Sequence, residues 1–148
     1  MDGHFEGNSI VIDLEIISLL ADSVKKIIPV VIDTGCTGDL ILTYTEAFPL
    51  ALTLVGIQDY TIADGSKVSF FECLGIVKLG NKKVVSTISI RPSGSLLMGV
   101  SLMKKLSLNL SVNFVTNEVV LTDIKNNQTQ NKTAIISSTN SSKKGKII

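Results

Sequence analysis

The sequence has few of the side chains that bind metals or form cysteine-based active sites. Among its 148 residues are two cysteines, Cys36 and Cys73, and one histidine, His4. A structural zinc site takes four cysteine or histidine ligands, and the chain has no CxxC pair. A cysteine nucleophile needs a histidine as its base, and His4 lies in an N-terminal segment that we expect to be frayed and solvated. We therefore expect no metal, no cofactor and no cysteine-based catalysis.

The sequence also lacks a strong charge of either sign and a long apolar run. Its 14 basic and 13 acidic residues leave a formal charge of +1, so neither nucleic acid nor an anionic membrane is expected as a partner. The apolar runs are too short to cross a bilayer. Asp13 and Glu15 interrupt the early apolar stretch, where a secretory signal needs a continuous one. We expect a soluble, cytoplasmic protein.

What the sequence does contain is a series of strand patterns. Apolar residues alternate with others over residues 10–17, which predicts a strand, and the many β-branched residues favour strands throughout. Further strands are expected at 24–32, 40–43, 58–63, 66–79, 82–90, 95–98, 108–114 and 118–124, with one short helix at 100–106. The polar residues 125–148 predict a disordered tail after a single domain at 1–124, with a strand at 134–136 as the alternative.

One feature of the strand at 24–32 needs an explanation. Val30, Val31 and Ile32 lead directly into the sequence Asp33-Thr34-Gly35. An ionised carboxylate at the end of a buried strand is costly unless something compensates it. The tripeptide alone would arise by chance in roughly a few per cent of chains of this length, so its context decides what it means.

The context consists of two further elements in a fixed order. Asp64-Gly65 is a strong hairpin signal at the head of a long strand pair. Leu97-Met98-Gly99 follows, leading into the predicted helix. This order resembles that of the single-domain retropepsin-like aspartic proteases, and the resemblance extends from about residue 10 to residue 124. It implies an all-β fold, a closed β-barrel of the acid-protease type with one short helix in the C-terminal half.

The resemblance also implies the activity and the site. The catalytic loop would be formed by Asp33, Thr34 and Gly35, and the hairpin would cover a bound peptide as a flap. Contacts with the peptide or protein substrate would come from the hairpin tip and the loop: Asp64, Gly65 and Gly38. In such enzymes two aspartates share one proton and activate a water molecule between them. This chain has one Asp-Thr-Gly and no Asp-Ser-Gly, so the second aspartate would come from an identical subunit.

The chain departs from the viral members of the family at several positions. Cys36 stands where alanine or serine is usual. Thr37 and Val100 replace the acidic residue and the arginine that form an ion pair in many viral enzymes, which favours the compact cellular and bacterial type. The family pattern places the dimer interface at residues 108–114 and at the N-terminal strand.

Other interpretations of the same residues remain open. Asp33 could be an ordinary turn aspartate, and Asp64-Gly65 a hairpin without substrate contact. The chain could also be a catalytically inactive relative that binds peptides or dimerises, or an unrelated β-barrel in which the tripeptide is accidental.

Overall fold

A computed structural model of the chain describes residues 1–123. The predicted polar tail at 125–148 and the predicted end of the domain at residue 124 lie outside the described residues. The strands are β1 (Asp2–Glu6), β2 (Ser9–Ile17), β3 (Lys25–Ile32), β4 (Leu40–Thr43), β5 (Thr53–Thr61), β6 (Lys67–Leu79), β7 (Lys82–Arg91), β8 (Leu97–Met98), β9 (Leu108–Asn113) and β10 (Glu118–Asp123). The helices are α1 (Tyr44–Ala47), the 3-10 helix η1 (Phe48–Leu50) and α2 (Val100–Lys105).

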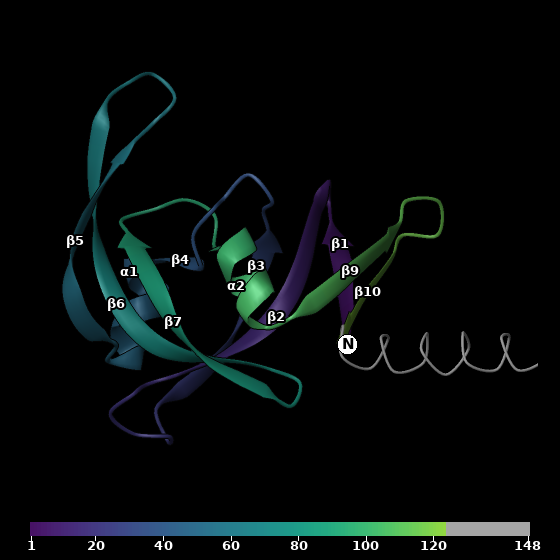
Figure 1. The fold of residues 1–148 in the computed structure, drawn as a ribbon, viewed down its shortest axis with the longest axis horizontal. Coiled ribbons are helices and arrows are strands. Elements are labelled where there is room, and N and C mark those ends of the chain that lie inside the picture. The colour runs from purple at the N-terminus through teal and green to yellow at the C-terminus, as the bar shows by residue number, and fades with distance from the viewer. Residues whose placement is uncertain (124–148) are drawn as a thin grey trace, which may run out of the picture.

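The strands form a partial ring (Figure 1). Strands β6, β7, β4, β8, β3 and β2 are hydrogen-bonded in that order, and β6 also pairs with β2. Strand β5 lies outside at one end, and β1, β10 and β9 extend from β2 at the other. The predicted all-β architecture is therefore present, but as a partial ring rather than as the closed barrel predicted. Strand β8 contributes only two residues to the ring, and β6 meets β2 only through residues 76–78.

The inner face of the ring strands is the hydrophobic core. Leu40 of β4 is opposite both Ile88 of β7 and Met98 of β8, and all three side chains are buried. Leu102 and Leu106, from α2 and the residue after it, pack on the same cluster. A buried side chain of this size contributes about 1.5–3 kcal/mol to folding. Because side chains alternate along a strand, the residues between these core positions face away from the core.

The N-terminal segment forms strand β1, where the sequence predicted frayed residues. Asp2 and Gly3 pair with Val120 and Val119 of β10, and residues 4–6 pair with β2. A Cβ atom on Gly3 would lie 2.8 Å from the Val119 side chain, so glycine permits this close approach. The strand that holds β1 in place lies at the other end of the described chain, so no local pattern could reveal the pairing.

The helices agree with the sequence pattern where that pattern was clear. Helix α2 begins directly after Gly99, as predicted. The segment before β5, whose pattern was ambiguous, forms α1 and η1, with Pro49 in the first turn of η1, where its missing N–H costs no hydrogen bond. Within residues 1–123, no helix is both long enough and apolar enough to cross a membrane.

Candidate active site

Asp33 lies at the end of β3, where the loop formed by residues 33–39 begins. Val31 pairs with Leu97 of β8, and the Asp33 N–H continues this ladder by donating to the Met98 carbonyl at 3.0 Å. The two sequence motifs are therefore adjacent in space, although about sixty residues separate them. The side chain of Asp33 is half-buried, so the loop leaves its carboxylate in partial contact with solvent.

The loop turns back tightly on the Asp33 carboxylate. The Gly35 N–H donates to Asp33 Oδ1 at 2.8 Å, and the Cys36 N–H donates to the Asp33 carbonyl at 3.1 Å. A Cβ atom on residue 35 would lie 3.1 Å from the same Oδ1, so a side chain here would crowd the carboxylate. The carboxylate thus has a hydrogen-bond donor at the strand end, which offsets part of its desolvation. Thr34 beside it is exposed.

The start of α2 holds the other half of the loop. Gly99 and Val100 donate through their backbone N–H groups to the carbonyls of Asp39 and Cys36, both at 2.8 Å. A Cβ atom on Gly99 would come within 2.1 Å of the Gly38 carbonyl oxygen. Only glycine allows the helix and the loop to approach so closely. The glycine of the second motif therefore fixes the backbone around Asp33.

Asp39, at the end of the loop, is a buried carboxylate that the sequence analysis missed. It accepts hydrogen bonds from Ser86 Oγ at 3.1 Å, from the Thr87 N–H at 3.0 Å and from Lys105 Nζ of α2. Burial alone would raise the pKa of Asp39. Hydrogen bonds from Lys105, Ser101 and Thr87 and the positive charge of Lys105 outweigh burial and hold that pKa below its usual value.

This ion pair occupies different positions from the pair of the viral enzymes. Residues 37 and 100 are uncharged in this chain. Instead, an ion pair between Asp39 and Lys105 connects the Asp33 loop to helix α2. The only local signal was an aspartate directly before the apolar strand β4. Nothing in the sequence indicated its partner, which lies 66 residues later.

The hairpin between β5 and β6 has its tip at residues 62–66. The Ile62 N–H donates to the Ser66 carbonyl at 2.9 Å, and Gly65 has a φ of +84°, a conformation that glycine adopts without strain. Asp64 Oδ1 accepts a hydrogen bond from the Ser66 N–H at 2.8 Å. Hydrogen bonds from the Ser66 side chain and backbone lower the pKa of the exposed Asp64.

A second polar cluster lies at the base of this hairpin. Glu72 Oε1 of β6 accepts hydrogen bonds from the Tyr60 hydroxyl at 2.9 Å and from Ser89 Oγ at 2.5 Å. The Tyr60 and Ser89 oxygens are 3.0 Å apart. Burial raises the pKa of the Tyr60 phenol; the hydrogen bond with Ser89 opposes this shift, and the hydrogen bond with Glu72 and the negative charge of Glu72 add to it.

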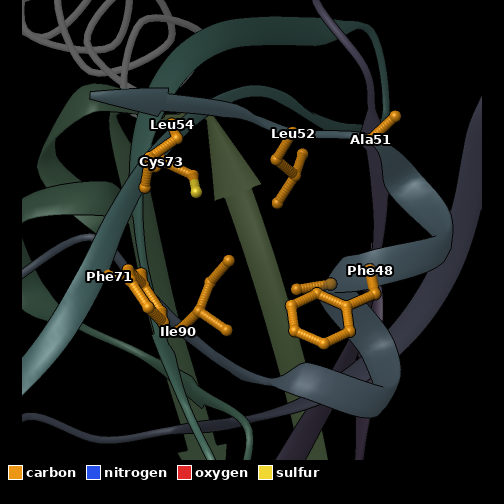
Figure 2. Close-up of a pocket in the computed structure, with 8 residues that line it drawn as sticks. Phe48, Ala51, Leu52, Leu54, Phe71, Cys73 and Ile90 are labelled. Carbon is orange, nitrogen blue, oxygen red and sulfur yellow. The ribbon is translucent and has the colours of Figure 1, made fainter. Parts of the chain in front are cut away.

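An apolar cavity of about 340 Å³ lies between this hairpin and the helices α1 and η1. Figure 2 shows the Phe48 ring and Leu52 on the side of η1, with Phe71 and Cys73 on the opposite side. The lining residues are Ala47, Phe48, Ala51, Leu52, Leu54, Phe71, Cys73 and Ile90. None of them belongs to the Asp33 loop, so this cavity is distinct from the candidate site.

The two cysteines do not form a disulfide within residues 1–123. Cys36 and Cys73 are both free thiols. Cys73 is buried, as expected for a small apolar residue, and burial followed by the charge of Glu72 raises its pKa. Among residues 1–123, no group of three or more His, Cys, Asp or Glu residues could hold a metal ion.

Comparison with known proteins gives matches in structure only. No protein-family model matches the chain, and no curated protein matches it significantly. The EIAV protease complexed with the inhibitor HBY-793 gives a TM-score of 0.54 at 15% identity, covering 73% of this chain and 100% of the other. A retropepsin-like aspartic protease from Rickettsia conorii gives a TM-score of 0.51 at 16% identity, covering 81% and 86%. The chain has the retropepsin-like fold.

In this retropepsin-like fold the predicted site residues fall into two groups. Asp33, Thr34, Gly35 and Gly38 lie together in the loop between β3 and β4. Asp64 and Gly65 lie in the separate turn between β5 and β6 (Figure 1), and no hydrogen bond or ion pair within residues 1–123 joins that turn to the Asp33 loop. Besides Asp39, sequence reasoning missed the Tyr60 cluster, because its members come from three strands whose register the sequence does not reveal.

Proposed function

We propose that the chain is an aspartic endopeptidase in which Asp33 is half of the catalytic dyad. The observation that carries this proposal is the position of Asp33. Its strand, its tight loop and Gly99 together fix a partly exposed carboxylate at the surface of a retropepsin-like fold. An ordinary turn aspartate would not need a second motif, whereas here Leu97-Met98-Gly99 is hydrogen-bonded to the backbone of the Asp33 loop.

Peptide hydrolysis requires both a base and an acid. One carboxylate removes a proton from the attacking water, while a second, protonated carboxyl stabilises the developing oxyanion and passes its proton on. The described chain has one Asp-Thr-Gly loop, and one carboxylate cannot hold both roles at once. A homodimer with two-fold symmetry supplies the second Asp33. Thr34, exposed at the side of the loop, is available to donate its hydroxyl to the backbone of the partner subunit.

Strand β9 is the element that we propose for the dimer contact. Residues 2–3 of β1 pair with β10 and residues 4–6 pair with β2, so each edge of β1 is partly occupied within the chain. Strand β9 pairs only with β10 among residues 1–123 and ends the strand order on that side (Figure 1). An unpaired edge strand is a template for pairing with another chain. Phe114 and Val115 at the β9–β10 turn are strongly exposed and would add apolar contact area.

The hairpin between β5 and β6 has the properties of a substrate cover. Strand β5 is the other free edge of the described sheet, and an extended peptide can bind such an edge by β-addition. The tip is a tight turn with Gly65, which permits close backbone approach. Closure over a bound peptide would exclude water from the reaction.

The test compares wild type with Asp33→Asn on a denatured protein substrate at mildly acidic pH. Asparagine keeps the acceptor for the Gly35 N–H, so the loop should survive while the carboxylate is lost. We expect cleavage by the wild type, inhibition by a pepstatin-type transition-state mimic, and a loss of about 10³-fold or more in Asp33→Asn. Undiminished cleavage by Asp33→Asn would exclude the mechanism. Binding without cleavage by a dimeric wild type would favour an inactive peptide-binding module.

A further inference from the structure

The face of the sheet that carries Asp33 can be followed across five strands. Side chains of directly paired residues point to the same face of a sheet. Pairing across β3, β8, β4, β7 and β6 gives one continuous row, which we call the Asp33-face row: Val31, Leu97, Ile41, Ser89 and Glu72. Asp33 follows Val31 by two residues and therefore lies on the same face. The alternating positions, such as Ile88 and Met98, belong to the core.

Glu72 at the far end of the Asp33-face row is held in a defined orientation. Its Oε1 accepts hydrogen bonds from the Tyr60 and Ser89 hydroxyls, while no hydrogen bond within residues 1–123 reaches Oε2. Phe70 precedes Glu72 by two residues and shares its face. Its ring centroid lies 5.2 Å from that of Tyr60, at an interplanar angle of 40°. A carboxylate beside two aromatic rings therefore faces the same side as Asp33.

The Glu72 carboxylate has no counter-ion in the described part of the chain. The ion pairs among residues 1–123 involve other carboxylates, from Asp2, Glu6, Glu15, Asp39 and Glu46. Arg91 shares the face of Ser89, but its guanidinium donates to the Ser95 carbonyl at 2.5 Å. Glu72 is half-buried, and a peptide covering this face would remove more of its water. Such desolvation is costly unless the ligand brings a positive charge.

We propose that Glu72, Tyr60 and Phe70 form a subsite for a lysine or arginine side chain of the substrate. This inference rests on the proposed function, because it assigns the substrate class of the same candidate site. The head group would pair with Glu72, and the apolar stem would lie against the two rings, where a cation is also attracted to the ring face. The preferred substrate is then a peptide with a basic residue a few positions from the scissile bond.

The spacing agrees with this assignment. Four strand steps at about 4.8 Å, about 19 Å along the sheet, separate Glu72 from the strand of Asp33, and the direct distance is shorter because the sheet curves into a partial ring. A residue three or four positions from the scissile bond of an extended peptide lies about 10–13 Å from it. The length of a lysine or arginine side chain covers the remainder.

The test uses a synthetic library of decapeptides in which lysine, arginine and the neutral norleucine occur equally often. Wild type is compared with Glu72→Gln, which keeps the shape and an acceptor but removes the charge. The matched control is Asp59→Asn. Asp59 pairs with Ser69 and accepts its hydroxyl hydrogen bond at 2.6 Å, on the opposite face of the same hairpin.

We expect the wild type to cleave basic peptides about tenfold faster, by kcat/KM, than their norleucine counterparts, as a charge-assisted hydrogen bond allows. Glu72→Gln should bring this ratio close to one, because the basic peptides lose the charge that favours them. Asp59→Asn should leave the ratio unchanged. Cleavage by the wild type without a basic preference, or a preference retained in Glu72→Gln, overturns the proposal.

Complete absence of cleavage would contradict the proposed function, and the subsite is then judged by binding alone. The same library is passed over immobilised wild type and Glu72→Gln, and the retained peptides are sequenced. Enrichment of basic peptides on the wild type that is lost in Glu72→Gln supports the subsite. Equal retention of basic and norleucine peptides on the wild type overturns it.

Discussion

The carboxylate of Asp39 accepts hydrogen bonds from Lys105 of α2 and from the Thr87 N–H of β7. The carbonyl of Asp39 accepts a further hydrogen bond from the Gly99 N–H. One residue thus joins the loop of Asp33 to a strand, to a helix and to the second sequence motif. The position of Asp33 should therefore depend on a pair of residues that touch neither the substrate nor the proposed dyad.

The first prediction concerns the partner of Asp39. Lys105→Met should lower the free energy of unfolding by about 1–3 kcal/mol, because it leaves a buried carboxylate with one donor fewer. The neighbouring Lys104 is exposed, and Lys104→Met should change stability by less than about 0.5 kcal/mol. Urea unfolding followed by circular dichroism measures both. Equal stability of the two variants would show that Lys105 does not support the loop.

The second prediction is a dependence of stability on pH. The pKa of Asp39 in the folded chain lies below its usual value of 3.8, because the hydrogen-bond donors and Lys105 favour the ionised form. Its stabilising contribution is therefore complete above about pH 4 and is lost as the pH falls through the lowered pKa. Asp39→Asn should make the unfolding free energy less dependent on pH below about 4. An acid slope identical to that of the wild type would contradict this role of Asp39.

The third prediction uses two glycines of the same site. Gly99→Ala places a methyl group 2.1 Å from the Gly38 carbonyl oxygen, so it should destabilise the protein by about 3 kcal/mol and displace the loop. A Cβ atom on Gly38 meets nothing within 4 Å, so Gly38→Ala should be tolerated. Thermal unfolding of both variants tests this contrast. Comparable melting temperatures would mean that the contact between helix and loop is less close than the structure has it.

The elements that the sequence predicted are those with local signals. Strand β4 at residues 40–43, helix α2 after Gly99 and the turn at Asp64-Gly65 each follow from a short pattern of apolar, glycine or turn residues. The contact between the Asp33 loop and Gly99 is long-range; the sequence analysis singled out both motifs but did not predict that they touch. The roles of Asp64, Gly65 and Gly38 in substrate binding stay predictions.

The features that the sequence did not predict depend on register and on distant partners. Strand β1 is held by β10 at the other end of the described chain, and Asp39 is paired with a lysine from α2. Glu72, Tyr60 and Ser89 meet because three strands align them, and a shift of one residue would turn Glu72 to the opposite face. The strands form a partial ring, in which β8 contributes two residues that pair with β3 and β4.

The most direct test of the central claim, that two chains share one active site, is a mixing experiment. Wild-type chain at constant concentration is equilibrated with increasing amounts of Asp33→Asn, and the rate of peptide cleavage is measured. If each site needs an Asp33 from both subunits, mixed dimers are inactive. Random exchange with an equal amount of Asp33→Asn should then halve the activity. A rate that stays constant at every ratio, with subunit exchange confirmed by labelled chains, would contradict the account.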